Sequence, residues 1–279
     1  MCIYCTMYIF FLSLAYFILV ASKKTYNISQ SEISVWLSAA AYCDVDKYPT
    51  MKIGEPANEF ILTDIIYSKK TDILGYVGIL HSSTTIYVVY RGSSSLLNWL
   101  DDFEIKKVPY DTFSQECIDC KVHYGFYQTA LSVRNQTVNS VIKLKNLYPN
   151  YSIICTGHSL GAAIAQLISM EFSKIDIKTS IYNFGQPRIG EKNYAMFVNK
   201  HIEDLWRFTH NKDTVVHLPL KKELDYYHSC VEIFEDELGS LSICSNTNCE
   251  DSNCADKYKL HETNEKDHHK YLKHEMECV

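Results

Sequence analysis

The chain has 279 residues, of which 47% are hydrophobic and 22% are charged, a composition that supplies one sizeable globular core. Its formal net charge is −6 and no block of basic residues stands out, which argues against nucleic acid as a partner. The sequence has no Pro/Gly/Ser-rich linker, internal repeat or low-complexity tract, so one large domain is favoured over two small ones.

The first 22 residues carry no charged side chain. The run from Tyr8 to Val20 predicts the apolar core of a signal peptide, with Ala21 at the end of its cleavage site. The absence of basic residues before this run is unusual, and a retained membrane anchor is the alternative, since about 20 apolar residues can span a bilayer. We expect a signal peptide over residues 1–21 and one mature domain over 22–279.

Cysteines and glycosylation sequons favour a secreted or lumenal location. Nine of the eleven cysteines follow the leader, so at least one is unpaired, and Cys155 is the candidate because it lies inside an apolar run. N-glycosylation sequons begin at Asn27, Asn135 and Asn150.

The remaining eight cysteines are candidates for disulfides. We expect a tight local disulfide between Cys117 and Cys120, and a long-range one between Cys43 and Cys278. Four cysteines cluster in a polar region, and the sequence leaves their pairing open: Cys230, Cys244, Cys249 and Cys254.

Apolar periodicity predicts the elements in chain order. We expect helices over 31–42, 126–147 and 160–173. We expect strands over 73–80, 85–90, 152–156, 179–184 and 204–209. Strands alternate with helices through the middle of the chain. This order indicates the α/β class, with a mostly parallel central sheet and helices on both faces.

The most informative motif is Gly157-His158-Ser159-Leu160-Gly161. It follows a predicted strand and opens a predicted helix, which is the context of a nucleophile elbow. Side chains two residues before or after the serine would collide with backbone, so glycine is needed there. We expect the Ser159 hydroxyl to be exposed above the sheet edge and the Leu160 N–H to point toward the reacting centre. A glycine-rich turn with an inert serine is the alternative.

A serine nucleophile needs a base that a carboxylate orients, and in this fold class the chain order is Ser, then Asp or Glu, then His. Asp213 is the best acid, because it lies just beyond the end of the strand predicted over 204–209. Spacing alone does not select the base among the histidines that follow: His217, His228, His261, His268, His269 and His274.

Several motifs resemble those of the fungal-type, or class 3, triacylglycerol lipases, a family with the α/β-hydrolase fold. They occur in family order from about Tyr42 to the C-terminus: Arg91-Gly92-Ser93-Ser94-Ser95 with Asn98-Trp99, His123-Tyr124-Gly125-Phe126, the elbow, Phe184-Gly185-Gln186-Pro187-Arg188-Ile189-Gly190, the Asp213 stretch, His228-Ser229 and Asp267-His268-His269-Lys270-Tyr271-Leu272. The family's last motif, D-H-x-x-Y and an apolar residue, selects His268 as the base. The adjacent His269 is its rival.

The resemblance also implies an oxyanion hole and a short helical lid. Ser93 would be the second oxyanion donor, beside the Leu160 N–H, and the loss of one such donor costs about a hundred- to a thousandfold in turnover. The lid would cover the site in water and turn an apolar face to lipid, although a packed surface helix is the alternative. Its apolar residues would be Leu96, Leu97, Trp99, Leu100 and Phe103.

We therefore expect a secreted hydrolase that cleaves triacylglycerol esters through an acyl-enzyme, with Ser159, His268 and Asp213 as its triad. It would need no cofactor, metal or obligate protein partner, and would act on lipid at an oil–water or membrane interface. The alternatives are another esterase on the same fold (a feruloyl esterase or phospholipase A1), a membrane-anchored lipase and a non-catalytic binding module. Irregular spacing disfavours a zinc site made of Cys249, Cys254, His261 and His274.

Overall fold

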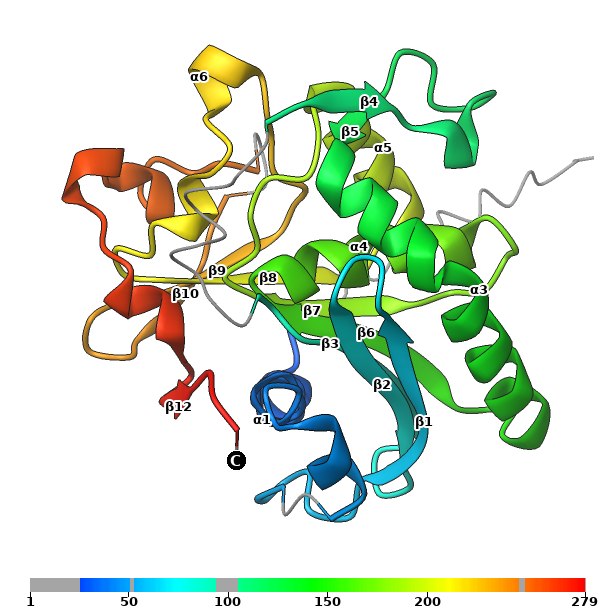
Figure 1. The fold of residues 1–279 in the computed structure, drawn as a ribbon. Coiled ribbons are helices and arrows are strands. Elements are labelled where there is room, and N and C mark those ends of the chain that lie inside the picture. The colour runs from blue at the N-terminus through cyan, green and yellow to red at the C-terminus, as the bar shows by residue number, and fades with distance from the viewer. Residues whose placement is uncertain (1–25, 51–52, 94–104, 246–248, 279) are drawn as a thin grey trace, which may run out of the picture.

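The structure, a computed structural model, describes residues 26–50, 53–93, 105–245 and 249–278. Among these residues, eight strands form one sheet in the order β1-β2-β3-β6-β7-β8-β9-β10 (Figure 1). The strands are β1 (Ile61–Ser68), β2 (Ile73–Leu80), β3 (Thr85–Tyr90), β6 (Ser152–His158), β7 (Ser180–Phe184), β8 (Leu205–His210), β9 (Glu232–Glu235) and β10 (Leu241–Ile243).

The middle of this sheet is parallel. Strands β3, β6, β7, β8 and β9 pair in the same direction, whereas β1, β2 and β10 are antiparallel additions at the edges. The predicted mostly parallel sheet is confirmed, and β1, β9 and β10 are strands that the sequence analysis did not predict. Because parallel strands end at the same edge, the residues that follow β3, β6 and β8 come together there.

Helices cover both faces of the sheet, as predicted. Helix α1 (Ile28–Ala40) packs on one face, while α3 (Tyr124–Leu147), α4 (Leu160–Ser173) and α5 (Lys192–His201) pack on the other (Figure 1). A single turn, α6 (Lys221–Leu224), lies farther out. Helix α1 begins earlier than expected because the Asn27 side chain caps it, accepting hydrogen bonds from the N–H groups of Ser29 and Gln30.

The central strands are buried on both faces. In β3, Ile86, Val88 and Tyr90 pack into the core beneath α3 and α4, while Tyr87 and Val89 pack into the core beneath α1. Successive side chains of a strand point to opposite faces, so this apolar run fills both cores at once. The removal of such surface from water stabilises the fold by about 25 cal/mol per Å².

The C-terminal part has little regular structure. Strand β11 (Lys270–Tyr271) pairs with β12 (His274–Glu275), and elsewhere β4 (Lys107–Pro109) pairs with β5 (Lys121–His123). Three short 3-10 turns, at 255–257, 260–262 and 266–269, lie between β10 and β11. Since such turns have few internal hydrogen bonds, contacts with the rest of the molecule must fix this part.

Four disulfides join described cysteines: Cys43–Cys278, Cys117–Cys120, Cys230–Cys249 and Cys244–Cys254. The first two are the pairs expected from the sequence, and the last two resolve the pairing left open. The Cys155 thiol is free and buried, and burial raises its pKa to about 12, so it stays protonated at neutral pH. Because Cys249 and Cys254 belong to two different disulfides, neither supplies a thiolate to the zinc site considered above.

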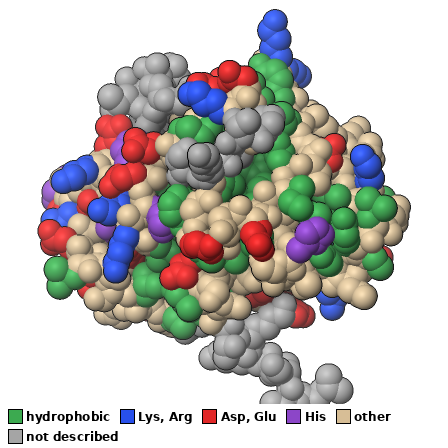
Figure 2. All heavy atoms as spheres, turned by 90° about the horizontal axis from the view of Figure 1, so that it is seen from below, with side chains coloured by type: hydrophobic (Ala, Val, Ile, Leu, Met, Phe, Trp, Pro, Cys, Tyr) green, Lys and Arg blue, Asp and Glu red, His purple; other side chains and the backbone are tan. Residues whose placement is uncertain are grey.

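The described surface carries charges of both signs. On the face in Figure 2, the Lys and Arg side chains lie among Asp and Glu side chains and form no continuous basic area within the described ranges. The side chains of the sequon residues Asn27, Asn135 and Asn150 are exposed. Within the described parts of the chain, no helix is both long and apolar enough to cross a membrane.

Candidate active site

A strained turn between β6 and α4 holds Ser159. Its backbone has φ +57° and ψ −128°, a conformation that residues with side chains rarely adopt. A Cβ on Gly161 would lie 2.1 Å from the carbonyl oxygen of Tyr90, and a Cβ on Gly157 would lie 2.5 Å from the carbonyl carbon of Gly161. Both glycines are therefore needed, for the steric reason that the motif suggested.

The Ser159 side chain is buried. Only 3% of the residue is exposed, so the expectation of an exposed hydroxyl is wrong for this structure. The segment after β3 packs against the turn: a Cβ on Gly92 would lie 3.0 Å from the Cβ of Ser159 and 2.9 Å from the carbonyl oxygen of His158. The same contact brings the next residue, Ser93, to the turn.

Asp213 follows the C-terminal end of β8 and is fully buried. Its Oδ2 accepts hydrogen bonds from Nδ1 of His268 at 2.8 Å and from the hydroxyl of Tyr271, and its Oδ1 accepts one from the N–H of Val215 at 2.7 Å. Burial alone would raise the pKa of this carboxyl, but the imidazole and the three hydrogen bonds outweigh burial and hold the pKa below its usual value. Asp213 is therefore an ionised and firmly held acceptor at neutral pH.

Of the two adjacent histidines, the structure brings His268 to Asp213. His268 is 1% exposed, whereas His269 is exposed and lies 3.5 Å from Glu265. Because Nδ1 of His268 donates to a carboxylate, its Nε2 carries the lone pair of the neutral ring. This buried Nε2 has no hydrogen-bond partner among the described residues, so it is free to accept a proton.

The end of β7 connects the serine turn to His268. The N–H of Ser159 donates to the carbonyl oxygen of Phe184 at 3.0 Å. The next residue, Gly185, has φ +57°, and a Cβ there would lie 2.7 Å from Cε1 of His268. The rings of His158 and His268 are also 4.3 Å apart between centroids. The turn that carries Ser159 and the loop that carries His268 therefore pack side by side at the carboxyl edge of the sheet, although they are far apart in the sequence.

His158 links the turn to the base loop and to the end of α1. Burial holds the pKa of His158 well below its usual value, so the ring is neutral. Its Nε2–H donates to the carbonyl oxygen of His268 at 2.8 Å, so Nδ1 must be the acceptor, and the Tyr42 hydroxyl donates to it at 2.6 Å. A Cβ on Gly92 would lie 2.2 Å from that hydroxyl. Tyr42 thus packs between the segment that carries Ser93 and the serine turn.

The other predicted site residues divide into two groups. Leu160 is the first residue of α4, so its N–H has no acceptor within the helix, and Ser93 lies nearby through Gly92. The predicted lid residues lie outside the described residues: Leu96, Leu97, Trp99, Leu100 and Phe103.

Sequence reasoning missed two tyrosines at this site. The hydroxyl of Tyr271 donates to Asp213, and the one available signal was the D-H-x-x-Y pattern, in which this tyrosine has a fixed place. Tyr42 had no signal, because nothing in the sequence relates the end of the first helix to His158.

Metal-binding residue types also come together in one place. Glu232, Cys244 and Cys254 are buried with possible ligand atoms within 4.8 Å of one another. However, the two sulfurs form the Cys244–Cys254 disulfide and are not thiolates. This group of residues therefore does not fit a metal ion.

Comparison with known proteins finds lipases that are similar to this chain in sequence and fold. The model of the family described as "Lipase (class 3)" matches residues 87–223. A lipase of Rhizomucor miehei is 33% identical over 181 residues, which are 62% of this chain and 48% of that protein. A secreted mono- and diacylglycerol lipase A of Penicillium cyclopium is 28% identical over 219 residues, 74% of this chain and 69% of that protein. The chain thus spans about half the length of the first of these relatives.

Solved structures agree over most of the chain. The Rhizomucor miehei lipase in its propeptide complex matches with a TM-score of 0.81 and 26% identity, covering 90% of this chain and 82% of that one. Lipase II of Rhizopus niveus matches with a TM-score of 0.81 and 25% identity, covering 90% of this chain and 96% of that one. This chain has the α/β-hydrolase fold, and over residues 87–223 it is similar to the class 3 lipases.

Proposed function

We propose that this protein is a secreted serine hydrolase that cleaves the carboxylic ester bonds of triacylglycerols. The observation that carries the proposal is the buried pair of Asp213 and His268, with the free Nε2 of His268 beside the strained Ser159 turn. A nucleophile, a base and an orienting acid in one place are what acyl transfer requires. The name of one relative, a secreted mono- and diacylglycerol lipase, supports acylglycerol esters as the substrate, and a solved structure titled as a triacylglycerol lipase supports the triacylglycerol class.

The first half of the reaction forms an acyl-enzyme. Oγ of Ser159 attacks the ester carbonyl carbon while Nε2 of His268 takes the serine proton. The carbonyl oxygen becomes an oxyanion, which accepts hydrogen bonds from the N–H of Leu160 and from the N–H and hydroxyl of Ser93. The carbonyl then re-forms, the bond to the alcohol oxygen breaks, and the alcohol leaves with the proton from His268. The acyl group remains on Ser159.

The second half repeats these steps with water. His268 takes a proton from a water molecule, whose oxygen attacks the acyl carbon, and the fatty acid leaves as Ser159 recovers its proton from His268. Asp213 keeps Nε2 of His268 as the acceptor in both halves and stabilises the imidazolium that forms. Its three hydrogen bonds fix it in place before the reaction, so little reorganisation is needed.

The location and processing belong to the same proposal. We infer that residues 1–21 are a cleaved signal peptide and that the mature chain, 22–279, is glycosylated at Asn27, Asn135 and Asn150. Four disulfides and three exposed sequons support an extracellular or lumenal location. The segment with Leu96, Trp99 and Phe103 would be the lid that turns its apolar face to lipid. Sequencing the N-terminus of the mature protein tests the cleavage, because a retained leader would indicate an anchored form.

A serine-directed phosphonate tests the nucleophile. We expect one equivalent to be incorporated and mass spectrometry of peptides to place it on Ser159, whereas Ser159→Ala protein with an unchanged circular dichroism spectrum incorporates none. Absence of labelling in the wild type would support a non-catalytic binding module. Labelling at another residue would refute the assignment of Ser159.

Paired substrates test the lipid specificity. We expect hydrolysis of a long-chain triacylglycerol emulsion to exceed that of a dissolved short-chain ester. Cleavage of the dissolved ester alone would favour another esterase on the same fold.

A further inference from the structure

A buried ion pair lies behind the segment that follows Asp213. Arg188 and Glu250 face each other with two parallel hydrogen bonds, Nε to Oε1 at 2.9 Å and Nη2 to Oε2 at 2.7 Å. Their side chains are 4% and 1% exposed. Burial alone would raise the pKa of Glu250, but the Arg188 guanidinium outweighs burial and holds the pKa well below its usual value. Breaking such a pair on one side leaves an uncompensated buried charge.

Nη2 of Arg188 also donates to Oδ1 of Asp256 at 3.3 Å, and the other donors of Arg188 go to three consecutive carbonyl groups. Its Nη1 donates to the carbonyl oxygens of His217 and Pro219, the latter at 3.1 Å, and its backbone N–H donates to that of Leu218 at 2.8 Å. Arg188 therefore fixes the path of the chain over residues 217–219. With Glu250 holding the other edge of the guanidinium, its plane cannot turn away from these carbonyls.

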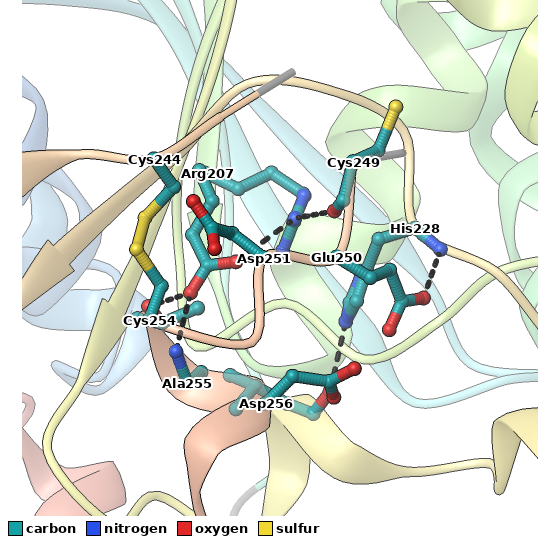
Figure 3. A network of polar contacts seen from close by, with 12 residues as sticks. Arg207, His228, Cys244, Cys249, Glu250, Asp251, Cys254, Ala255 and Asp256 are labelled. Atoms are coloured by element: carbon teal, nitrogen blue, oxygen red, sulfur yellow. Dashed lines mark hydrogen bonds and ion pairs between the residues drawn. A yellow bond between two sulfur atoms is a disulfide. The ribbon is translucent and has the colours of Figure 1, made fainter. Parts of the chain in front are cut away.

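Glu250 reaches the same segment by a second route, through His228. The backbone N–H of His228 donates to Oε1 of Glu250 at 2.9 Å (Figure 3). Nε2–H of His228 donates to the carbonyl oxygen of Val216 at 2.8 Å. Burial keeps the pKa of His228 well below its usual value, so the ring is neutral and this tautomer is set by the carbonyl. One carboxylate thus holds the two residues that bind the four consecutive carbonyls of 216–219.

These carbonyls belong to the segment that also holds Asp213. The N–H of Val215 donates to Oδ1 of Asp213, and Val215–His217 form a 3-10 turn. One side of this short turn therefore faces the triad carboxylate, and its carbonyls face Arg188 and His228. A shift of the turn would move the acceptor that orients His268.

Disulfides fix the point at which Glu250 enters the interior. The preceding residue, Cys249, is bonded to Cys230. The Cys244–Cys254 bond joins residues on either side of Glu250 in the sequence (Figure 3). The carbonyl oxygen of Cys249 also accepts a hydrogen bond from Nη2 of the buried Arg207 at 3.2 Å. A segment with so little regular structure thereby presents one carboxylate at a defined place.

We propose that Glu250 is a positioning residue for ester hydrolysis: through Arg188 and His228 it holds the 215–219 segment so that Asp213 keeps His268 in its working orientation. This role rests on the proposed function. It predicts a change in turnover more than in substrate binding, since Glu250 lies behind Asp213 and has no place among the reacting groups.

The test compares two carboxylate-to-amide changes in the same buried region. Glu250 and Glu232 are both 5% exposed, but the Glu232 carboxylate accepts hydrogen bonds from Thr209 and Ala255 and lies 3.9 Å from Arg207. It is not bonded to Arg188 or His228, the residues that hold 216–219. Hydrolysis of a dissolved short-chain ester is measured below the unfolding midpoint of each variant. We expect Glu250→Gln to lower kcat by about tenfold to a hundredfold with KM within about threefold, and Glu232→Gln to keep kcat within about twofold.

His228 supplies a second test that does not depend on the stability of Glu250→Gln. Leu at this position has no donor for the Val216 carbonyl, whereas the side-chain amide of Gln carries an N–H near the place of Nε2. We expect His228→Leu to lower kcat by about threefold to tenfold and His228→Gln to restore most of it. A purely structural role would lower the unfolding midpoint without this selective recovery of kcat.

The outcomes are distinguishable. If the wild type is active and Glu250→Gln keeps its kcat, or loses no more kcat than Glu232→Gln, the positioning role alone is overturned. An equal loss of kcat in His228→Leu and His228→Gln also overturns it. A wild type that neither hydrolyses esters nor reacts with the phosphonate overturns the proposed function, and the role of Glu250 falls with it.

Discussion

The strand–turn–helix unit of residues 152–173 and the C-terminal part of residues 205–278 meet where His158 packs against His268, but they are held in different ways. The first is continuous in sequence and depends on shape: glycines at 157 and 161 let backbone approach backbone, and buried alanines line α4. The second is assembled from separate short segments by disulfides, buried ion pairs and side-chain bonds to carbonyls. Ser159 is thus positioned by local sterics, and His268 and Asp213 by long-range polar contacts.

The two regions should therefore respond differently to amino-acid substitution. A change in the first unit acts through overlap of atoms, and its effect is readable from neighbours in sequence. A change in the second acts through partners that are distant in the chain, so two adjacent residues can differ completely in effect. The predictions below sharpen that contrast, beginning with the largest.

Replacement of the two adjacent histidines gives the sharpest separation. We expect His268→Ala to lower kcat by about 10⁶-fold, because Nε2 is the proton acceptor, and His269→Ala to leave it unchanged, because His269 is exposed. The measurement is the hydrolysis rate of a dissolved ester. If His269→Ala were the inactive variant, the assignment of the base would be wrong.

Asp213→Asn is expected to lower kcat by about 10⁴-fold, because an amide in this place favours the wrong imidazole tautomer. The variant should still fold and should react with the phosphonate far more slowly than the wild type. Near-normal labelling would show that His268 does not need Asp213.

The tyrosine at the end of α1 offers a matched pair. The hydroxyl of Tyr42 donates to His158, and that of Tyr48 donates to the carbonyl oxygen of Ala41 at 2.7 Å. Each change to Phe removes one hydrogen bond, but only the first touches the site. We expect Tyr42→Phe to lower kcat by about twofold to tenfold and Tyr48→Phe to leave kcat unchanged while lowering the unfolding midpoint. Equal kcat values in the two variants would contradict a role for the Tyr42 hydroxyl in the site.

The smallest predicted effect is on stability in acid. The pKa of Glu250 is lowered in the folded state, so its charge stabilises the fold above the unfolded value of about 4.3, and this contribution is lost as the pH falls toward the lower folded value. We therefore expect the difference in unfolding free energy between wild type and Glu250→Gln to be constant above about pH 5 and to shrink below pH 4. Denaturant titrations at several pH values measure it, and a difference that grew in acid would contradict the ion pair.

The helices and strands were predictable where the apolar residues of the sequence repeat with the period of the element they form. Strands β2 and β3 and helix α4 begin and end where the apolar pattern placed them, because each is buried along its whole length. Strand β1 was missed because all of its residues except Ile66 are partly buried or exposed, and β10 because it is short and largely exposed. Where one face meets solvent at an edge, the apolar signal is weak.

The sequence predicted the candidate catalytic residues of the site but not the residues that hold them in place. The Ser159 turn follows from its own five residues, and the D-H-x-x-Y pattern singled out His268 over His269. Three contacts at the site join residues that meet only after folding. They are Asp213 with His268, Tyr42 with His158, and Glu250 with the residues that bind the 216–219 carbonyls. The pairing of Cys230 with Cys249 and of Cys244 with Cys254 is of the same kind.

The sequence by itself determined most of the central strands with their helices, the resemblance to class 3 lipases and the Ser159 turn. Steric demands on the backbone act between near neighbours, so they are visible locally as glycines and as apolar periodicity. Only the tertiary structure decided which carboxylates and imidazoles face one another. Hydrogen bonds and ion pairs form between groups that the fold brings together, and the spacing of these groups along the chain does not predict which of them will be in contact.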